Sequence, residues 1–401
     1  METQPQKPNK RRLKWKQYAV MVLVGGLLFG LGLSVGNGTI TVASRSSSTQ
    51  TNLPKDLDYR EVEELYDTLR ANYDGEVTLD QLQDGLKQGI TSATGDPYTE
   101  YLNAEESQEF DQELSGSFTG IGAELSRKEE QIIVVAPIAG YPAEKAGLRA
   151  KDVIVEIDGK TTYDLTLTEA VKRIRGPKGT VVKLKVVRDG SKEVDIEITR
   201  DNISIPSVEY EIKDGNIGYL KISRFGDDTV ELATQAANEF KAKKVTGVVV
   251  DVRNDPGGLL DASVDVAGLW LNDKVVLTER RGGTTIKTYR SRSGAPLAGI
   301  PTVVLINQGS ASASEILAGA LKDNDAATLV GEKTFGKGSV QKLDTLSSGG
   351  TLKVTIARWY TPNGKNIDKE GIQPDQKVEI TEEDFTADRD PQLDAALKKL
   401  Q

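Results

Sequence analysis

Two uninterrupted apolar runs in the second half of this 401-residue chain constrain its fold more than any other feature. Residues 246–252 (TGVVVDV) and 301–306 (PTVVLI) show no alternation of polar and apolar side chains, so both faces of each predicted strand must be buried. The elements predicted around them are helices at 229–243 and 312–323 and strands at 218–222 and 327–330. Strand–helix alternation is typical of parallel strands with helices on the sheet faces. We therefore predict an α/β core with a mostly parallel sheet over residues 205–380, extended by a strand at 351–359.

A β-rich module is predicted ahead of this core, over residues 115–200. Turn signals at Asp158-Gly159 and Asp189-Gly190 divide short apolar or alternating runs. The predicted elements are strands at 131–136, 153–157, 181–187 and 194–198 and a helix at 167–174. This pattern predicts a small strand-rich unit with one or two helices.

The segments at either end of these two regions are predicted to be helical or charged. Apolar residues at three- and four-residue spacing predict amphipathic helices over residues 55–114, interrupted by a turn at 95–98. Such helices either pack on the globular body or pair with a second copy of the chain, and the sequence leaves both alternatives open. Residues 381–401 are predicted to form a charged tail with a short helix at 391–400.

The N-terminus carries a basic segment, residues 1–17, followed by an uncharged apolar run at 18–35 (YAVMVLVGGLLFGLGLSV). As a helix this run is about 27 Å long, which is at the short end for a membrane span. We predict a transmembrane signal anchor with a Ser-, Thr- and Gly-rich linker at 36–54; a signal peptide cleaved near 41–43 is the alternative. The positive flank predicts that the bulk of the chain is extracytoplasmic, in a single-pass cell-membrane protein or, after cleavage, a secreted one.

Residue types that are absent narrow the chemistry. The chain has no Cys and no His, which excludes a thiol nucleophile, a disulfide framework, a Ser-His-Asp triad and metal sites built on His or Cys. Its formal net charge of −9 also argues against a nucleic-acid partner, because such proteins present basic surfaces. Hydrolytic chemistry in this chain must therefore use Asp, Glu, Lys, Ser, Thr or Tyr.

A cluster of small residues follows the apolar strand at 301–306. Residues 307–315 (NQGSASASE) lead into a predicted helix, whose N-terminus presents free N–H groups and the positive end of the helix dipole to a developing oxyanion. A Ser before a helix with a Glu three residues later is also an ordinary capping signal. Taken alone, this block favours capping.

A second block, residues 331–341 (GEKTFGKGSVQ), superficially matches two known motifs. Its spacing nearly fits a nucleotide-binding P-loop, but Gly338 stands where that loop needs the hydroxyl that binds magnesium, and an alternating strand follows in place of a helix. Residues 339–342 fit the S-x-x-K pattern of penicillin-binding proteins, but the accompanying S-D-N and K-T-G motifs are absent from the sequence. We reject both interpretations.

Without His or Cys, a serine nucleophile needs a neutral amine as its base. An exposed Lys has a pKa of about 10.4, and burial beside apolar groups lowers that pKa. Lys337 lies between two glycines and two residues after Phe335. We predict that Phe335 and a tight loop desolvate Lys337; the ordinary alternative is a solvated loop lysine.

The two blocks together resemble the signatures of one family. Residues 310–315 (SASASE) and 335–341 (FGKGSVQ) resemble the signature blocks of the carboxyl-terminal processing proteases, also called tail-specific proteases. The resemblance covers about residues 55–380 and implies a serine-lysine dyad. The implied catalytic residues are the nucleophile Ser312, the base Lys337 and an assisting Gln341.

A third block, residues 251–258 (DVRNDPGG), resembles the D-L-R-x-N-P-G-G loop of the same family. The resemblance implies that the backbone N–H groups of Gly258 and Ala313 form the oxyanion hole. Asp255 stands where the family often carries Asn. A simple turn after a strand would account for the same glycines.

The module at 115–200 resembles a PDZ domain, which this family inserts before its catalytic core; the matching blocks are 143–148 (AEKAGL) and 152–159 (DVIVEIDG). The resemblance implies a loop whose N–H groups receive a substrate's terminal carboxylate, while the adjoining strand takes up the peptide by β-augmentation. The implied residues are Thr119, Gly120, Ile121 and Gly122 in that loop, with Arg175 coupling the module to the active site.

The resemblance thus implies a serine endopeptidase that cleaves proteins with unstructured C-terminal tails near or from that end, with no metal or organic cofactor. It also implies a homodimer formed through residues 55–113 and the C-terminal tail. Membrane contact is predicted separately, from the apolar run at 18–35. The alternative is a non-enzymatic protein: a membrane-tethered PDZ scaffold on an inactive protease-like core.

Overall fold

The structure is a computed structural model that describes residues 54, 56, 58–128, 130–292 and 294–401. The predicted anchor at 18–35 lies outside the described residues. Over the described part of the chain, no helix combines the length and the hydropathy that crossing a lipid bilayer requires. The chain divides after Val77 into two compact units.

The first unit contains the helix α2 (Tyr59–Asn72), which begins where Asp58 accepts the N–H of Arg60. The helix confirms the helical prediction for this stretch. Large apolar side chains along it are exposed, namely those of Tyr59, Val62, Leu65, Tyr66 and Leu69. The amphipathic spacing therefore produces an apolar face that stays accessible.

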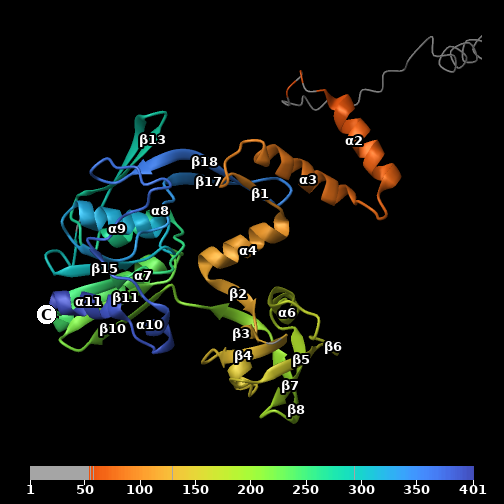
Figure 1. Cartoon of the computed structure of the whole chain (residues 1–401), viewed down its shortest axis with the longest axis horizontal. Coiled ribbons are helices and arrows are strands. Elements are labelled where there is room, and N and C mark those ends of the chain that lie inside the picture. Colours follow the sequence, from red (N-terminus) through yellow and green to blue (C-terminus); the bar gives the residue numbers. More distant parts are fainter. Residues whose placement is uncertain (1–53, 55, 57, 129, 293) are drawn as a thin grey trace, which may run out of the picture. The chain divides into compact units, whose positions relative to one another are not determined.

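The second unit contains a six-stranded sheet packed between helices (Figure 1). In sheet order its strands are β10 (Val208–Lys213), β11 (Ile217–Ile222), β12 (Gly247–Asp251), β15 (Thr302–Ile306), β16 (Thr328–Gly331) and β19 (Gln376–Lys377). All neighbouring pairs are parallel except β10 with β11. The prediction of a mostly parallel sheet, with the two apolar runs as its inner strands, is confirmed.

Both faces of this sheet are covered, which explains why its inner strands are apolar throughout. The covering helices are α7 (Thr229–Lys243), α8 (Leu260–Ala267) and α9 (Ala313–Asp323) on one face and α11 (Pro391–Leu400) on the other. Val248 packs into the first of these two cores and its neighbour Val249 into the second. The predicted helix at 391–400 is confirmed, and because it buries Ala396 it belongs to the core and is no free tail.

A second, antiparallel sheet lies beside the first. Its strands are β1 (Glu100–Leu102), β18 (Thr351–Tyr360), β13 (Val275–Arg281) and β14 (Thr284–Arg290), and β17 (Ser339–Thr345) also pairs with β18. The prediction that residues 351–359 extend the parallel sheet is wrong. A tight turn joins β17 to β18, with the Leu346 N–H donating to the Gly350 carbonyl at 2.8 Å, so the two strands form an antiparallel hairpin.

Strand β1 is a further departure, because it lies within the stretch for which only helices and a turn were predicted. It falls between α3 (Leu79–Ser92) and α4 (Ala104–Ser115), and Glu100 pairs with Lys353 across to β18. Three residues are too few to show a strand period in the sequence. Through β1, this part of the N-terminal segment packs on the globular body.

The β-rich module forms a separate antiparallel sheet around its own core. Its strands are β3 (Ala123–Lys128), β4 (Gln131–Pro137), β5 (Val153–Ile157), β6 (Lys160–Thr161), β7 (Val181–Arg188) and β8 (Lys192–Thr199), with the helices α5 (Pro142–Lys145) and α6 (Leu167–Ile174). The four predicted strands and the predicted helix are confirmed.

The chain enters and leaves this module through a two-stranded ribbon of β2 (Ser117–Gly120) and β9 (Asp201–Ser204). Beside the ribbon, the guanidinium of Arg224 donates to the carbonyl oxygens of Ser115 at 3.3 Å and Ile205 at 2.7 Å. One side chain of the α/β core thus binds both segments that connect the core to the β-rich module.

Candidate active site

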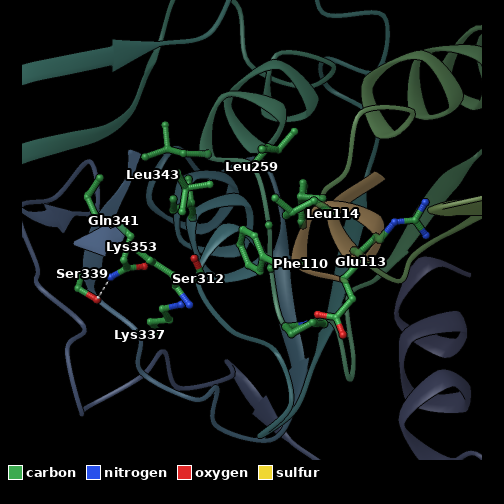
Figure 2. A pocket seen from close by; sticks show the side chains of 18 of the residues that line it. Phe110, Glu113, Leu114, Leu259, Ser312, Lys337, Ser339, Gln341, Leu343 and Lys353 are labelled. Carbon is green, nitrogen blue, oxygen red and sulfur yellow. Dashed lines mark hydrogen bonds between the residues drawn. The ribbon is translucent and has the colours of Figure 1, made fainter. Parts of the chain in front are cut away.

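A mainly apolar cavity of about 330 Å3 lies between α4, α9, the segment 256–260 and the β17–β18 hairpin (Figure 2). Its apolar lining includes Phe110, Leu114, Phe225, Leu259, Ile316, Leu343 and Trp359. Four of the residues singled out in the sequence also line it: Gly258, Ser312, Lys337 and Gln341. Segments from distant parts of the sequence therefore converge here.

Ser312 stands at the N-terminus of α9 as its capping residue. The capping interpretation of this block is therefore confirmed, and it does not exclude a second role for the serine. Its backbone is unusual, with φ 54° and ψ −112°. These angles match the first central residue of a type II′ turn, a position that glycine normally takes. A serine held in such a sparsely populated conformation at a cavity wall is a feature typical of functional sites.

Lys337 lies in the same cavity and is half-buried (Figure 2). Its amine is 5.2 Å from the centre of the Tyr98 ring. No carboxylate lies within ion-pair distance of this amine among the residues that the structure describes. Burial lowers the pKa of Lys337 below its ordinary value, and the positive charge of Lys353 lowers it further, while Glu100 and Glu315 oppose the shift. The cavity thus favours the neutral amine.

The origin of this burial differs from the sequence prediction. Phe335 is 54% exposed, so it does not desolvate Lys337. Tyr98 provides the aromatic neighbour instead, from the turn that precedes β1. The prediction that Phe335 shields the amine is wrong, because Phe335 is largely exposed and does not line the cavity that holds Lys337.

A second lysine, Lys353 of β18, shares the cavity but is differently placed (Figure 2). Its amine is paired with the Glu100 carboxylate at 2.6 Å and lies 5.4 Å from the centre of the Phe110 ring. Lys353 is therefore held by an ion pair beside the amine of Lys337, which has no such partner among the described residues. The sequence analysis did not identify Lys353.

Gln341 lies on β17, and its side-chain amide donates to the hydroxyls of Ser339 at 2.7 Å and Thr355 at 3.4 Å. Within the described residues, no hydrogen bond joins Lys337 to Gln341 or to the hydroxyl of Ser312. The three residues share one cavity without forming a hydrogen-bonded chain.

The oxyanion-hole candidates are both available as donors. Neither the N–H of Gly258 nor that of Ala313 donates a hydrogen bond within the part of the chain that the structure describes. Their segments are in direct contact, since a Cβ placed on Gly257 would lie 2.8 Å from the Cβ of Ser312 and 2.9 Å from the Ala313 nitrogen. Two unused N–H groups beside the serine are the arrangement that an oxyanion needs.

Glu315, which the sequence analysis treated only as a capping residue, connects the two blocks. Its fully buried carboxylate accepts hydrogen bonds from the backbone N–H groups of Ser312 and Lys337, both at 2.9 Å. It also accepts from the Gly336 N–H and the Thr334 hydroxyl. Burial raises the pKa of Glu315, and these four donors counteract the shift. One side chain thus fixes the serine and the lysine loop relative to each other.

The predicted carboxylate-binding loop lies between β2 and β3 in the β-rich module. Thr119 and Gly120 end β2, and the N–H groups of the next two residues, Ile121 and Gly122, donate no hydrogen bond within the described residues. Strand β3 follows, pairs with β4 on one side and lies at the edge of its sheet. Two unused N–H groups at the start of an edge strand fit the capture of a peptide terminus by strand addition.

Arg175 lies at the C-terminal end of α6, with its guanidinium 4.5 Å from the centre of the Phe118 ring. It therefore contacts the ribbon through which the chain enters the module. It does not line the cavity around Ser312.

Comparisons with known proteins agree with this arrangement. The model of peptidase family S41 matches residues 216–378, and a PDZ domain model matches residues 133–188. An S41 protease structure from Bacteroides fragilis NCTC 9343 covers 84% of this chain and 96% of its own, with a TM-score of 0.56 at 15% identity, which supports the fold.

Curated relatives match over most of the chain. The carboxy-terminal processing protease CtpA of Bacillus subtilis (strain 168) is 35% identical over 375 residues, which cover 92% of this chain and 78% of the relative. A probable CtpA-like serine protease of Staphylococcus haemolyticus (strain JCSC1435) is 37% identical over 374 residues, covering 92% and 74%. The resemblance seen in the sequence is thereby confirmed, and this chain belongs to the carboxy-terminal processing proteases, serine-type peptidases of family S41 that carry a PDZ domain.

Proposed function

We propose that this peptidase cleaves its substrates through a Ser-Lys dyad, with Ser312 as nucleophile and Lys337 as general base. The observation that carries the proposal is the shared cavity, in which a strained serine and an amine of lowered pKa lie beside two unused N–H groups. The chain has neither imidazole nor thiol to do the same work. Desolvation is the ordinary way to make a lysine act as a base near neutral pH.

In the proposed reaction, the neutral amine of Lys337 takes the proton of the Ser312 hydroxyl as that oxygen bonds to the scissile carbonyl carbon. The carbonyl oxygen becomes an oxyanion and accepts the N–H groups of Gly258 and Ala313, each worth about 3 kcal/mol in such sites. The intermediate expels the amine of the leaving fragment, which takes the proton from Lys337 and leaves an acyl-enzyme. Water, deprotonated by Lys337, then attacks the ester, and Ser312 regains its proton.

Assembly of the dyad requires a side-chain movement, because the amine of Lys337 is not bonded to Ser312 in the present arrangement. The carbonyl oxygen of the Gln341 side chain accepts no hydrogen bond within the described residues. We assign it the role of accepting one from Lys337 and so aiming the amine at Ser312. Catalytic hydrogen bonds commonly form only once substrate is bound.

We also propose that the PDZ domain captures the unstructured C-terminal tail of a protein substrate. The N–H groups of Ile121 and Gly122 receive the terminal carboxylate, and β3 pairs with the tail as an added strand. Arg175, stacked on Phe118 in the entry ribbon, is the candidate for relaying occupancy of the groove towards the protease core.

The proposed setting is a cell membrane, with residues 18–35 as anchor and the peptidase on the extracytoplasmic side; a secreted form after signal-peptide cleavage is the alternative. The exposed apolar face of α2 supports pairing with a second copy of the chain. Alkaline extraction of membranes tests the anchor, and light scattering of the purified chain tests the dimer.

The test of the dyad compares Ser312→Ala and Lys337→Ala with wild type in cleavage of an unfolded protein that carries a free C-terminal tail. Both variants are expected to lose cleavage while melting cooperatively. Lys333→Ala, which removes an exposed lysine from the same loop, is the matched control and is expected to keep full activity. Retained cleavage in either dyad variant would refute the mechanism and favour a scaffold that binds tails without cutting them.

A further inference from the structure

Asp255 lies in the same loop as Gly258, three residues before it, and is 0% exposed. One carboxyl oxygen, Oδ1, accepts the N–H of Gly257 at 2.8 Å. The other, Oδ2, is buried and has no hydrogen-bond partner within the described residues. A buried carboxylate oxygen without a donor is costly, and this one needs an explanation.

Asp255 also joins the two halves of the proposed oxyanion hole through its backbone. Its carbonyl oxygen accepts the N–H of Ala311 and the hydroxyl of Ser314, both at 3.0 Å. The nucleophile Ser312 and the donor Ala313 lie between those two partners in the sequence. Any movement of Asp255 is therefore passed to both oxyanion-hole segments.

The hydroxyl of Ser314 lies near the Asp255 carboxyl and opposes its protonation, but it donates at 3.0 Å to the Asp255 carbonyl oxygen and leaves Oδ2 without a hydrogen bond in the described structure. A buried Oδ2 without a donor favours the neutral carboxylic acid, because burial penalises the charged form.

The surrounding charges do not supply an alternative partner. Arg224 is the cation that acts on this carboxyl from the segment before α7, but no ion pair joins the two in the described structure. Its Nη2 donates to Ser115, Ile205 and Asp228, and its buried Nε has no partner among the described residues. On α9, the carboxylate of Glu315 is turned to the lysine loop by its own donors.

In the same loop as Asp255, Arg253 is paired with Asp251 at 2.6 Å and with Asp390 at 2.8 Å, so it is not paired with Asp255. Burial accordingly raises the pKa of Asp255 to about 7, with the Gly257 N–H, Ser314 and Arg224 opposing the shift. The neutral acid is therefore accessible at physiological pH.

We propose that Asp255 is a positioning residue that supports the oxyanion hole as a neutral carboxylic acid, and that ionisation of this buried carboxyl displaces the Gly257–Gly258 loop and slows catalysis. The inference rests on the oxyanion hole assigned above. It predicts that an asparagine, which has the same shape and a permanent N–H donor in place of the O–H, performs this role without titrating.

The experiment measures kcat against pH, and melting temperature against pH, for the full chain and its Asp255→Asn variant. The wild-type kcat is expected to fall several-fold between pH 7 and pH 9, whereas Asp255→Asn keeps a flatter profile over that range. Asp255→Leu, which cannot accept the Gly257 N–H, is expected to lose activity at every pH. Asp261→Asn, which removes an exposed carboxyl from α8, is the matched control and is expected to follow wild type.

The melting temperature reports the protonation state of Asp255 independently of catalytic activity. Because the folded-state pKa is raised above the ordinary value of 3.8, the stabilising contribution of this group is lost as pH rises towards and through about 7. The melting temperature of Asp255→Asn should therefore exceed that of wild type increasingly from pH 5 to pH 8. This comparison remains valid even if Ser312→Ala retains activity and the proposed mechanism fails.

Two results would overturn the inference. Parallel melting curves for wild type and Asp255→Asn across this pH range would show that the buried carboxyl does not take up a proton on folding. Diverging melting curves with identical kcat profiles would show a protonated Asp255 that does not position the oxyanion hole.

Discussion

Two loops of this molecule each present a pair of unused backbone N–H groups, and they are built in opposite ways. In the PDZ domain the pair belongs to Ile121 and Gly122, which are neighbours in the sequence. In the protease core the pair belongs to Gly258 and Ala313, which lie on different segments and meet only because residues 257–258 pack against the start of α9.

The difference follows from what each pair is proposed to bind. A terminal carboxylate carries its charge before it binds, so a local loop that forms with its own small domain is sufficient. An oxyanion exists only during the reaction, and its donors must be fixed relative to a nucleophile and a base. Here that fixing depends on distant contacts, among them the Glu315 carboxylate that binds the backbone of Ser312 and Lys337.

The largest effect is expected for Gly258→Ala, which tests whether the loop of the protease core donates to an oxyanion. A Cβ at this position would lie 2.1 Å from the carbonyl oxygen of Phe225, so the loop must shift and withdraw its N–H. We expect kcat to fall about 100- to 1000-fold, with little change in KM for a substrate held by its tail. Steady-state kinetics on an unfolded substrate measure both constants.

Gly89→Ala serves as the matched control, since a Cβ on this glycine of α3 meets nothing within 4 Å. It is expected to behave as wild type. If Gly258→Ala raised KM and left kcat intact, the loop would be a substrate-binding element and not part of an oxyanion hole.

Gly122→Ala addresses the other loop and should give the opposite kinetic pattern. Its φ is +74° and a Cβ would lie 2.4 Å from the Cβ of Tyr141, so the carboxylate-binding loop is distorted. We expect KM for a tail-bearing substrate to rise about tenfold with kcat nearly unchanged, which corresponds to the loss of about 1.4 kcal/mol of binding.

Gly140→Ala in the same domain has a similar φ of +81° but an open space for its Cβ, so it shares the backbone strain without the clash. It should leave KM close to the wild-type value. An equal rise in KM for both variants, or for a substrate whose C-terminus is amidated, would argue against carboxylate capture by this loop.

The smallest effect is expected from changes to the ion pair of Lys353 and Glu100. They should alter the pH dependence of catalysis and leave the affinity for the substrate tail unchanged. The charge of Lys353 lowers the pKa of Lys337 and that of Glu100 raises it. Since the neutral amine is the active form in the proposed mechanism, Lys353→Gln should move the acidic limb of the kcat/KM profile to higher pH and Glu100→Gln to lower pH. Each shift is expected to stay below about one pH unit.

The affinity of the PDZ domain for a free peptide should not change in either variant, as fluorescence titration can check. Shifts of the same sign in Lys353→Gln and Glu100→Gln would mean that the ion pair acts through packing and not through its charges.

Much of the fold could be predicted from residue patterns because its signals are local. The inner strands β12 and β15 are apolar throughout since both sheet faces are covered, and α6 and α7 begin and end where the spacing of apolar residues indicates. Strand β1 could not be predicted, because three residues show no period. The separate sheet of β18 depends on pairing partners that the strand pattern does not specify.

The residues of the candidate site likewise divide into those that could be predicted from the sequence and those that could not. Ser312, Lys337 and Gln341 lie in recognisable blocks, and the structure places all three in one cavity. Two neighbours of the Lys337 amine come from segments that become adjacent to it only on folding: Tyr98, whose ring lies 5.2 Å away, and Lys353, whose charge lowers the pKa of Lys337. Their contribution could not be inferred from spacing along the chain.

The backbone at Ser312 bears on how such chains lose their activity. Positive φ with ψ near −112° destabilises any residue that has a Cβ, by about 1–3 kcal/mol, and glycine escapes most of this penalty. A single change to glycine would therefore remove the hydroxyl and make the folded chain more robust at the same time. Under the proposed mechanism, the serine at this position costs the fold stability that a glycine would keep, because the reaction needs its hydroxyl.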